Sequence, residues 1–245
     1  MVRVATLNLR SNANRWDERF PMIVDSLIKT NADVIGLQEV RLKIEQHQLI
    51  ADAMNAKNNT FYTPFLCEDW YEPHILANAF LVRIPVIEHE RIELPEGYRT
   101  AQRVLIDVGG QPTNIVNTHL HHKPYRDEKI RYRQMETILS WMDNFTYPFV
   151  LMGDMNARPY SETIALAFKQ LQSAHKTVHG SEPSVTFPTP LRASEKLTPR
   201  AIDYILYDDA FVVQDCKLVG GEAHPDDDTL YLSDHFGLVA NLDLA

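Results

Sequence analysis

Polar residues that could bind a metal ion or move protons follow several apolar stretches of this sequence. Near the end of the chain, Ser233-Asp234-His235 joins a carboxylate to a titratable imidazole. Three other polar groups close apolar, β-branched runs: Gln38-Glu39, Asn117-Thr118-His119 and Gly153-Asp154-Met155-Asn156. Such runs predict buried strands, and α/β proteins usually place their sites at the carboxyl ends of strands. Together with Asn8 near the start, five segments therefore point to one pocket.

Taken singly, these residues also have structural interpretations. A buried Glu39 is costly unless it is paired or bound to a cation, and a salt bridge to Arg41 or another arginine would satisfy it. Asp154-Met155-Asn156 alone is better explained by an Asx turn or a cap. His119 alone is more often a satisfied core histidine than a ligand or a catalyst.

Asp203 is harder to explain structurally, because it lies in the apolar stretch Ile202-Asp203-Tyr204-Ile205-Leu206. A lone carboxylate in such a strand needs a partner, and His235 is the obvious candidate. A buried aspartate would fix the tautomer of the imidazole and raise its pKa, as a general acid or a phosphate-binding imidazolium requires.

Composition limits the possible functions. The chain has 245 residues, 44% hydrophobic content and a formal net charge of -9, enough for one large core and without a global field that attracts polyanions. Small or neutral substrates are favoured, and nucleic acid is possible but less expected. Cys67 and Cys216 show no zinc spacing and no disulfide framework, although one isolated disulfide is compatible. No apolar run suits a signal peptide or a membrane span, so we expect a soluble, cytoplasmic protein; the sequence gives no oligomeric state.

Strand-like and helix-like segments alternate and predict a single domain, residues 1–245. The spacing of apolar residues predicts helices over residues 19–31, 42–55, 130–145 and 161–172, the last capped by Ser161 with Glu162 in its first turn. Besides the runs above, strands are expected over residues 2–7, 32–37, 61–65, 79–82, 86–94, 103–108, 149–152, 202–207, 211–218 and 237–242. Because each half supplies strands with its own helices, we expect an α/β fold of two packed sheets with helices outside.

The motifs together resemble the endonuclease/exonuclease/phosphatase superfamily, in the family's order and over nearly the whole chain. They are Thr6-Leu7-Asn8-Leu9, Gln38-Glu39, Asn117-Thr118-His119-Leu120, Gly153-Asp154-Met155-Asn156, Ile202-Asp203-Tyr204-Ile205 and Ser233-Asp234-His235. The resemblance implies a DNase-I-like four-layer α/β/β/α sandwich, with two packed mixed sheets flanked by helices. It also implies metal-dependent hydrolysis of a phosphoester.

The resemblance further assigns a metal site. Glu39 resembles the family's principal Mg²⁺ ligand, with Asn8 beside it and Asp234 completing the site directly or through water. These oxygen ligands suit Mg²⁺ or Mn²⁺.

Catalytic roles are implied in the same way. Asp154 resembles the residue that orients and deprotonates the attacking water, and Asn156 and His119 would donate hydrogen bonds to phosphoryl oxygens. His235, oriented by Asp203, resembles the imidazole of the family's Asp-His dyad, as base, acid or charge stabiliser.

The substrate is less well defined. Asn117-Thr118-His119-Leu120 followed by His121-His122 is similar to the sphingomyelinase, deadenylase and tyrosyl-DNA phosphodiesterase branches. We expect a phosphodiesterase or phosphatase acting on a small-molecule or lipid-derived phosphoester. An endo- or exonuclease acting on DNA or RNA is the alternative, and a non-catalytic binding or scaffold protein on the same fold is a minor one.

Three surface features bear on that choice. A basic cluster could hold a phosphate or a nucleic-acid backbone, or could be a solvated helix face: Lys123, Arg126, Lys129, Arg131 and Arg133. Asp226-Asp227-Asp228 would repel a long polyanion. Phe61-Tyr62 and Trp70-Tyr71 could wall a pocket for a base or an apolar group, although core packing is the expected use of at least two of them.

Overall fold

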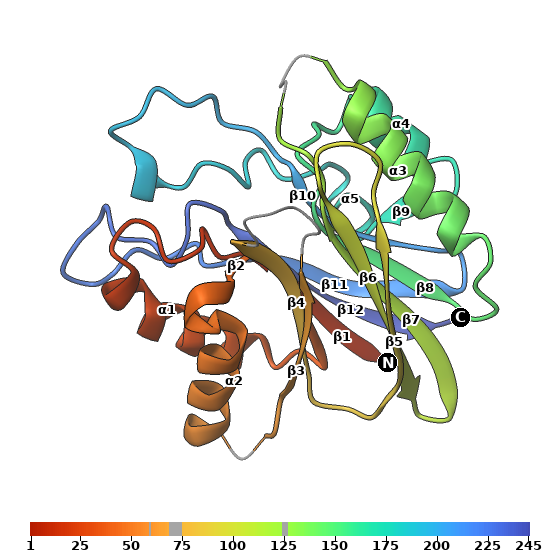
Figure 1. Ribbon diagram of the computed structural model, residues 1–245, viewed down its shortest axis with the longest axis horizontal. Coiled ribbons are helices and arrows are strands. Elements are labelled where there is room, and N and C mark those ends of the chain that lie inside the picture. Colours follow the sequence, from red (N-terminus) through yellow and green to blue (C-terminus); the bar gives the residue numbers. More distant parts are fainter. Residues whose placement is uncertain (59, 69–74, 124–126) are drawn as a thin grey trace.

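Two six-stranded sheets pack face to face in the computed structural model, which describes residues 1–58, 60–68, 75–123 and 127–245 (Figure 1). In spatial order the first sheet contains β11 (Phe211–Val219), β12 (Gly237–Leu244), β1 (Val2–Asn8), β2 (Val34–Arg41), β4 (Leu76–Val82) and β3 (Thr63–Glu68). The second contains β5 (Val86–Glu93), β6 (Thr100–Val108), β7 (Gln111–His119), β8 (Phe149–Asp154), β10 (Asp203–Tyr207) and β9 (Gln172–Ser173). Both sheets are mixed, because β1–β2 and β7–β8 pair in parallel.

Helices cover the outer face of each sheet (Figure 1). The helices α1 (Trp16–Thr30) and α2 (Gln46–Lys57) pack on the first sheet, and α3 (Lys129–Met142) and α4 (Glu162–Ala167) pack on the second. Along β1, Ala5 and Leu7 face the helices whereas Val4 faces the other sheet, as the alternation of side chains along a strand requires. The predicted α/β/β/α sandwich is therefore confirmed.

Several element boundaries differ from those predicted. The helix expected over residues 42–55 is divided at Glu45, whose φ is 48°, into the 3₁₀ turn Leu42–Ile44 and α2. The one expected over 161–172 stops at Ala167, because Gln172–Ser173 pairs with β10 as a strand. Apolar spacing continues across both interruptions and cannot show them. Two short elements, α5 (Ala174–His179) and the 3₁₀ turn η2 (Pro190–Arg192), were not predicted.

The predicted N-terminal cap of α4 is confirmed. Ser161 caps α4 by accepting a hydrogen bond from the Ile164 nitrogen, 3.2 Å away, and Glu162 lies in the first turn. Among the described residues, no helix combines the length and apolar character that crossing a membrane would require.

Hydrogen bonds join the two sheets at the end where the parallel strands finish. Asn117 Nδ2 of β7 donates to the carbonyl oxygens of Leu37 and Ala79 in the first sheet, each at 3.1 Å. Gln38 Nε2 donates to Asn117 Oδ1 at 2.7 Å and to Thr6 Oγ1 at 2.9 Å. A buried network of this kind fixes how the facing sheets align, because sliding them would leave polar groups unpaired.

Close approach of β7 and β8 depends on Gly153. Its φ is 137°, and a Cβ atom there would lie 2.0 Å from the carbonyl oxygen of Thr118. In this register His119 lies beside Asp154 at the ends of the two strands. The glycine therefore places a candidate catalytic carboxylate next to a candidate hydrogen-bond donor.

We predict that Gly153→Ala lowers the free energy of unfolding by about 2 kcal/mol or more, because the added methyl group combines a forbidden φ with a clash against backbone. Gly109→Ala is the control: its φ is also positive, at 64°, but no atom lies within 4 Å of the added Cβ. Guanidinium unfolding of both variants measures the difference. Equal losses would show that the contact with Thr118 imposes no constraint.

Candidate active site

The predicted site residues come from the ends of strands in both sheets. Asn8 ends β1, His119 ends β7 and Asp154 ends β8, while Asp203 begins β10 directly opposite Asp154. Ser233-Asp234-His235 precedes β12 and is tied to β1, because Ser233 Oγ donates to the Asn8 carbonyl oxygen at 2.6 Å. The strand order thus brings residues that are far apart in sequence to one end of the sandwich.

Asp154 lies at the centre of this group and is buried. Its Oδ2 accepts a hydrogen bond from Asn8 Nδ2 at 3.0 Å and lies 3.5 Å from His119 Nε2 and 3.8 Å from His235 Nε2. Its Oδ1 accepts from the Asn156 nitrogen at 2.9 Å, so the Asx-turn interpretation is also correct. Burial and the neighbouring Asp203 raise the pKa of Asp154 to about 7. A carboxyl group with such a pKa suits proton transfer near neutral pH.

The predicted pairing of Asp203 with His235 is present. His235 Nδ1 lies 3.0 Å from Asp203 Oδ2, and the imidazole packs against the ring of Phe187 with 4.7 Å between centroids. Burial opposes the charge on His235, but the carboxylates of Asp203 and Asp154 outweigh it and raise the pKa to about 10. His235 is therefore an imidazolium at neutral pH.

His119 has the opposite character. Its Nδ1 lies 3.4 Å from Arg99 Nη1, and because a guanidinium only donates, Nδ1 must accept and Nε2 must carry the hydrogen. Burial and the charge of Arg99 hold the pKa of His119 well below its usual range. His119 is therefore a neutral donor whose N–H faces Asp154. Arg99 lies between β5 and β6 and was not predicted as a site residue.

The predicted metal ligands lie around the same strand ends. Glu39 has a φ of 54° at a shift in the register between β2 and β4, and such bulges re-aim side chains. It is partly exposed and makes no side-chain hydrogen bond or salt bridge within the described part of the chain. The salt bridge to Arg41 or to another arginine, the structural alternative for Glu39, is thus not found among these residues.

Asp234 offers an unsatisfied oxygen. Its Oδ2 lies 3.1 Å from Arg192 Nη1 and 3.5 Å from Arg10 Nε, but its buried Oδ1 has no hydrogen-bond partner among the described residues. A buried carboxylate oxygen normally has a partner. The carboxylate of Glu39 and the amide oxygen of Asn8 are the other predicted ligands, and all three would offer oxygen donors of the kind that hard divalent cations prefer.

A second group of ligand atoms lies nearby, since atoms of Asp154, Asp203 and His235 fall within 4.8 Å of one another. An imidazole must be deprotonated to bind a metal ion, whereas this one is held as an imidazolium with Nδ1 bonded to Asp203. The geometry of this second group is therefore that of a hydrogen-bonded charge network.

Arg19 is a further residue that the sequence did not identify. It is fully buried, and its guanidinium donates to five carbonyl oxygens, those of Leu9, Ser11, Ala13, Asn14 and Leu232. It joins the loop after Asn8 to the residue before Ser233. A single arginine among the apolar positions of a helix is the only sequence signal for it.

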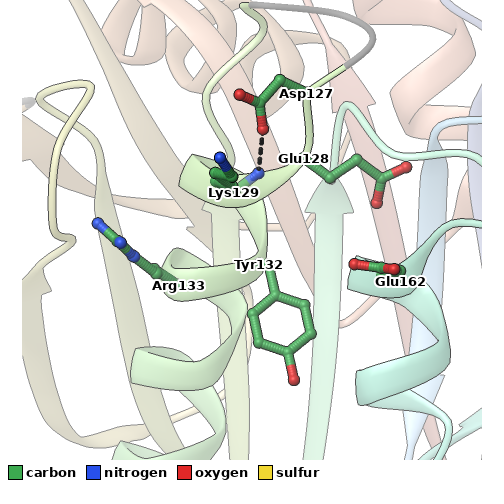
Figure 2. A pocket seen from close by; sticks show the side chains of 6 residues that line it. All are labelled: Asp127, Glu128, Lys129, Tyr132, Arg133 and Glu162. Carbon is green, nitrogen blue, oxygen red and sulfur yellow. Dashed lines mark hydrogen bonds between the residues drawn. The ribbon is translucent and has the colours of Figure 1, made fainter.

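Two arginines of the basic cluster, Arg131 and Arg133, are buried or paired rather than free on the surface. Arg131 is buried and donates to the carbonyl oxygens of His121 and Asp127, and Arg133 pairs with Glu96 at 2.6 Å. Arg126 lies outside the described residues. Lys129 and Arg133 line a hollow of about 550 Å³ (Figure 2), whose other lining residues are Asp127, Glu128, Tyr132 and Glu162. Three carboxylates against two cations make it a mixed surface, and it contains none of the candidate site residues.

The remaining surface predictions have mixed outcomes. Tyr62 is a core residue whose hydroxyl donates to the Ala32 carbonyl oxygen, whereas Phe61 is 74% exposed. Trp70 and Tyr71 lie outside the described residues. Asp227, in the acidic run, pairs with Arg15 at 2.6 Å.

We predict that Asp203→Asn lowers the pKa of His235 from about 10 toward its ordinary value, because Asp203 is the main group that opposes the effect of burial. NMR titration of the His235 ring in the presence of a chelator measures the shift. Asp227→Asn removes a nearby carboxylate that contacts Arg15 and Thr229 instead and should leave the titration unchanged. An unchanged pKa of His235 in Asp203→Asn would show that Asp203 does not stabilise the imidazolium, and so would contradict the Asp-His dyad.

Comparison with known proteins agrees with this architecture. Residues 5–235 match the model of the Endonuclease/Exonuclease/phosphatase family. No curated protein matches the sequence.

Solved structures share the fold at low sequence identity. An endonuclease/exonuclease/phosphatase family protein from Bacteroides thetaiotaomicron is 19% identical, with a TM-score of 0.80 and 100% and 98% of the two chains covered. The catalytic domain of human Nocturnin with a bound sulfate anion is 20% identical, with a TM-score of 0.75 and 100% and 94% covered. The Bacteroides thetaiotaomicron mannosyl-6-phosphatase Bt3783 is 19% identical, with a TM-score of 0.75 and 100% of both chains covered.

Proposed function

The chain belongs to the endonuclease/exonuclease/phosphatase family of phosphoester hydrolases, and we propose that it is a Mg²⁺- or Mn²⁺-dependent phosphodiesterase or phosphatase acting on a small-molecule or lipid-derived substrate. Residues 1–245 would form a single catalytic domain. The observation that carries the proposal is the position of Asp154. This buried carboxyl group, with a pKa near neutrality, is surrounded by Asn8, His119 and His235 and lies close to the unsatisfied oxygen donors.

The metal site would consist of Glu39, Asn8 and Asp234. Its support is the unpartnered Oδ1 of Asp234 and the absence of a salt bridge to Glu39 within the described residues. A divalent ion held there would neutralise charge that develops on the phosphoryl oxygens.

Asp154 would orient a water molecule and take its proton as the oxygen attacks phosphorus. Asn8 Nδ2, bonded to Oδ2, and the Asn156 nitrogen, bonded to Oδ1, hold the carboxylate in one orientation. Such fixed orientation is a large part of what makes a general base effective.

The transition state would be stabilised by donors that are already in place. His119 offers a neutral Nε2–H, and Asn156 Nδ2 donates to the Leu120 carbonyl oxygen at 3.0 Å, which leaves one N–H for a phosphoryl oxygen. The His235 imidazolium, held by Asp203, adds a positive charge near the reacting group. Preorganised donors cost no rearrangement during the reaction.

The electrostatics favour a small substrate over nucleic acid. The net charge is -9, Arg131 is buried and Arg133 is paired. A protein with six or more phosphate contacts loses about 10³ in affinity or more between roughly 50 and 200 mM salt. Faster turnover of duplex DNA than of bis-p-nitrophenyl phosphate, with a steep dependence on salt, would identify a nuclease instead.

We predict that a chelator abolishes hydrolysis of bis-p-nitrophenyl phosphate and that Mg²⁺ or Mn²⁺ restores it. Glu39→Gln should raise the metal concentration that gives half the maximal rate, because it removes a charged ligand. Glu45→Gln is the matched control: Glu45 has a similar φ, 48° against 54°, but is exposed at the start of α2. Full activity in excess chelator would exclude the mechanism.

We also predict that Asp154→Asn folds normally and loses about 10²- to 10⁴-fold in kcat, the usual contribution of a positioned general base. Asp208→Asn serves as the control, since Asp208 follows the opposite end of β10 and accepts hydrogen bonds from the Phe149 and Ala210 nitrogens. Circular dichroism and thermal melts establish folding. If Asp154→Asn instead melts early with its specific activity intact, Asp154 is only a turn-forming residue.

A further inference from the structure

Arg10 holds unused hydrogen-bond donors beside the candidate metal site. It lies two residues after Asn8, and its backbone nitrogen donates to Asn8 Oδ1 at 3.0 Å. Its Nε lies 3.2 Å from Asn14 Oδ1 and 3.5 Å from Asp234 Oδ2. Within the described residues, neither Nη group makes a hydrogen bond, and the side chain is 29% exposed. The forked end of the guanidinium is thus available to a ligand.

Arg10 is not needed to neutralise the charge of Asp234. Arg192 is the closer partner, with Nη1 at 3.1 Å from Asp234 Oδ2. The other loop arginine, Arg15, is fully engaged by comparison: its Nη groups contact Glu18 and Asp227 at 2.6 Å each. Arg10 is therefore the arginine of this loop that reaches the site through Nε while its Nη groups make no hydrogen bond within the described residues.

The loop around Arg10 is held in one conformation. Arg10, Ser11, Asn14 and Arg15 all have positive φ values, between 45° and 59°. The guanidinium of Arg19 binds four carbonyl oxygens of residues 9–14. Strained backbone persists where surrounding contacts determine it, so the Arg10 side chain starts from a fixed position.

We infer that Arg10 binds two terminal oxygens of the substrate's reacting phosphate and so makes the site selective for a phosphate monoester. The inference rests on the proposed function and narrows its substrate class. A guanidinium fork matches two oxygens of one phosphate group. A monoester has three terminal oxygens and a diester has two. If one terminal oxygen faces the proposed metal site, only a monoester has two further terminal oxygens that the Arg10 guanidinium can bind.

The reaction follows from that selectivity. Water adds its oxygen to phosphorus, the bond from phosphorus to the ester oxygen breaks, and the leaving alcohol takes up a proton. The products are an alcohol and inorganic phosphate, which carries the same oxygens that Arg10 binds in the substrate.

The test compares p-nitrophenyl phosphate with bis-p-nitrophenyl phosphate in wild type, Arg10→Gln, Arg10→Lys and Arg15→Gln. Arg10→Gln should lose about 10- to 100-fold in kcat/KM on the monoester, as expected for lost charged hydrogen bonds, and only a few-fold on the diester. Arg10→Lys keeps the charge without the fork and should recover little of the loss. Arg15→Gln removes an equal charge from the same loop and should behave as wild type.

Three outcomes would each overturn the inference but not the proposed function: equal losses of kcat/KM on the two esters in Arg10→Gln, no loss in that variant, or full activity in Arg10→Lys. Calorimetric titration with inorganic phosphate gives a readout that is independent of turnover: Arg10→Gln should bind it at least about tenfold more weakly, and unchanged affinity would overturn the inference. A wild-type protein that hydrolyses neither ester with metal present would overturn the proposed function and this selectivity with it.

Discussion

Two buried carboxylates face each other across neighbouring strands, and the positive charge between them is what the candidate site depends on. Asp154 and Asp203 are opposite partners in β8 and β10, and the imidazolium of His235 lies within 3.8 Å of both. Without that cation, the burial of two like charges would force protonation or separation. The segment that carries His235 is held accordingly: Ser233 Oγ bonds to the Asn8 carbonyl oxygen and the Phe236 nitrogen to that of Thr186.

The charge pattern divides the site into two parts. On the side of Asp154, Asp203 and His235, one imidazolium contacts two carboxyl groups, and the neighbours of each group set its proton position. On the side of Glu39 and Asp234, carboxylate oxygens remain without a partner in the described residues. The first part is suited to moving a proton and the second to attracting a cation, and both are needed to hydrolyse a phosphoester.

The features that the sequence predicted share a local signal. Apolar runs mark buried strands, so the polar residues at their ends could be placed together. A lone carboxylate in an apolar strand, Asp203, needed a partner, and His235 is that partner. The missed residues have no such signal. Arg99 reaches the site from a loop and Arg192 from the 3₁₀ turn η2, through long side chains whose contacts depend on tertiary structure. The division of the predicted helix at Glu45 was missed because the spacing of apolar residues does not show where a residue adopts a left-handed backbone conformation.

The oxygens of the proposed metal site belong to the first sheet, whereas the two carboxyl groups that face His235 belong to the second. Asn8 and Glu39 come from the first sheet, as does the segment before β12 with Asp234, whereas His119, Asp154 and Asp203 come from the second. Direct contacts link them: Asn8 Nδ2 donates to Asp154 Oδ2, and His235, on the same segment as Asp234, bonds to Asp203. The alignment of the sheets therefore sets the separation between the proposed metal ligands and Asp154, the proposed general base. Gln38 and Asn117 bond across the interface, and a Cβ at Gly36 would lie 2.9 Å from Asn117. We therefore expect these three residues to influence that separation through the alignment of the sheets.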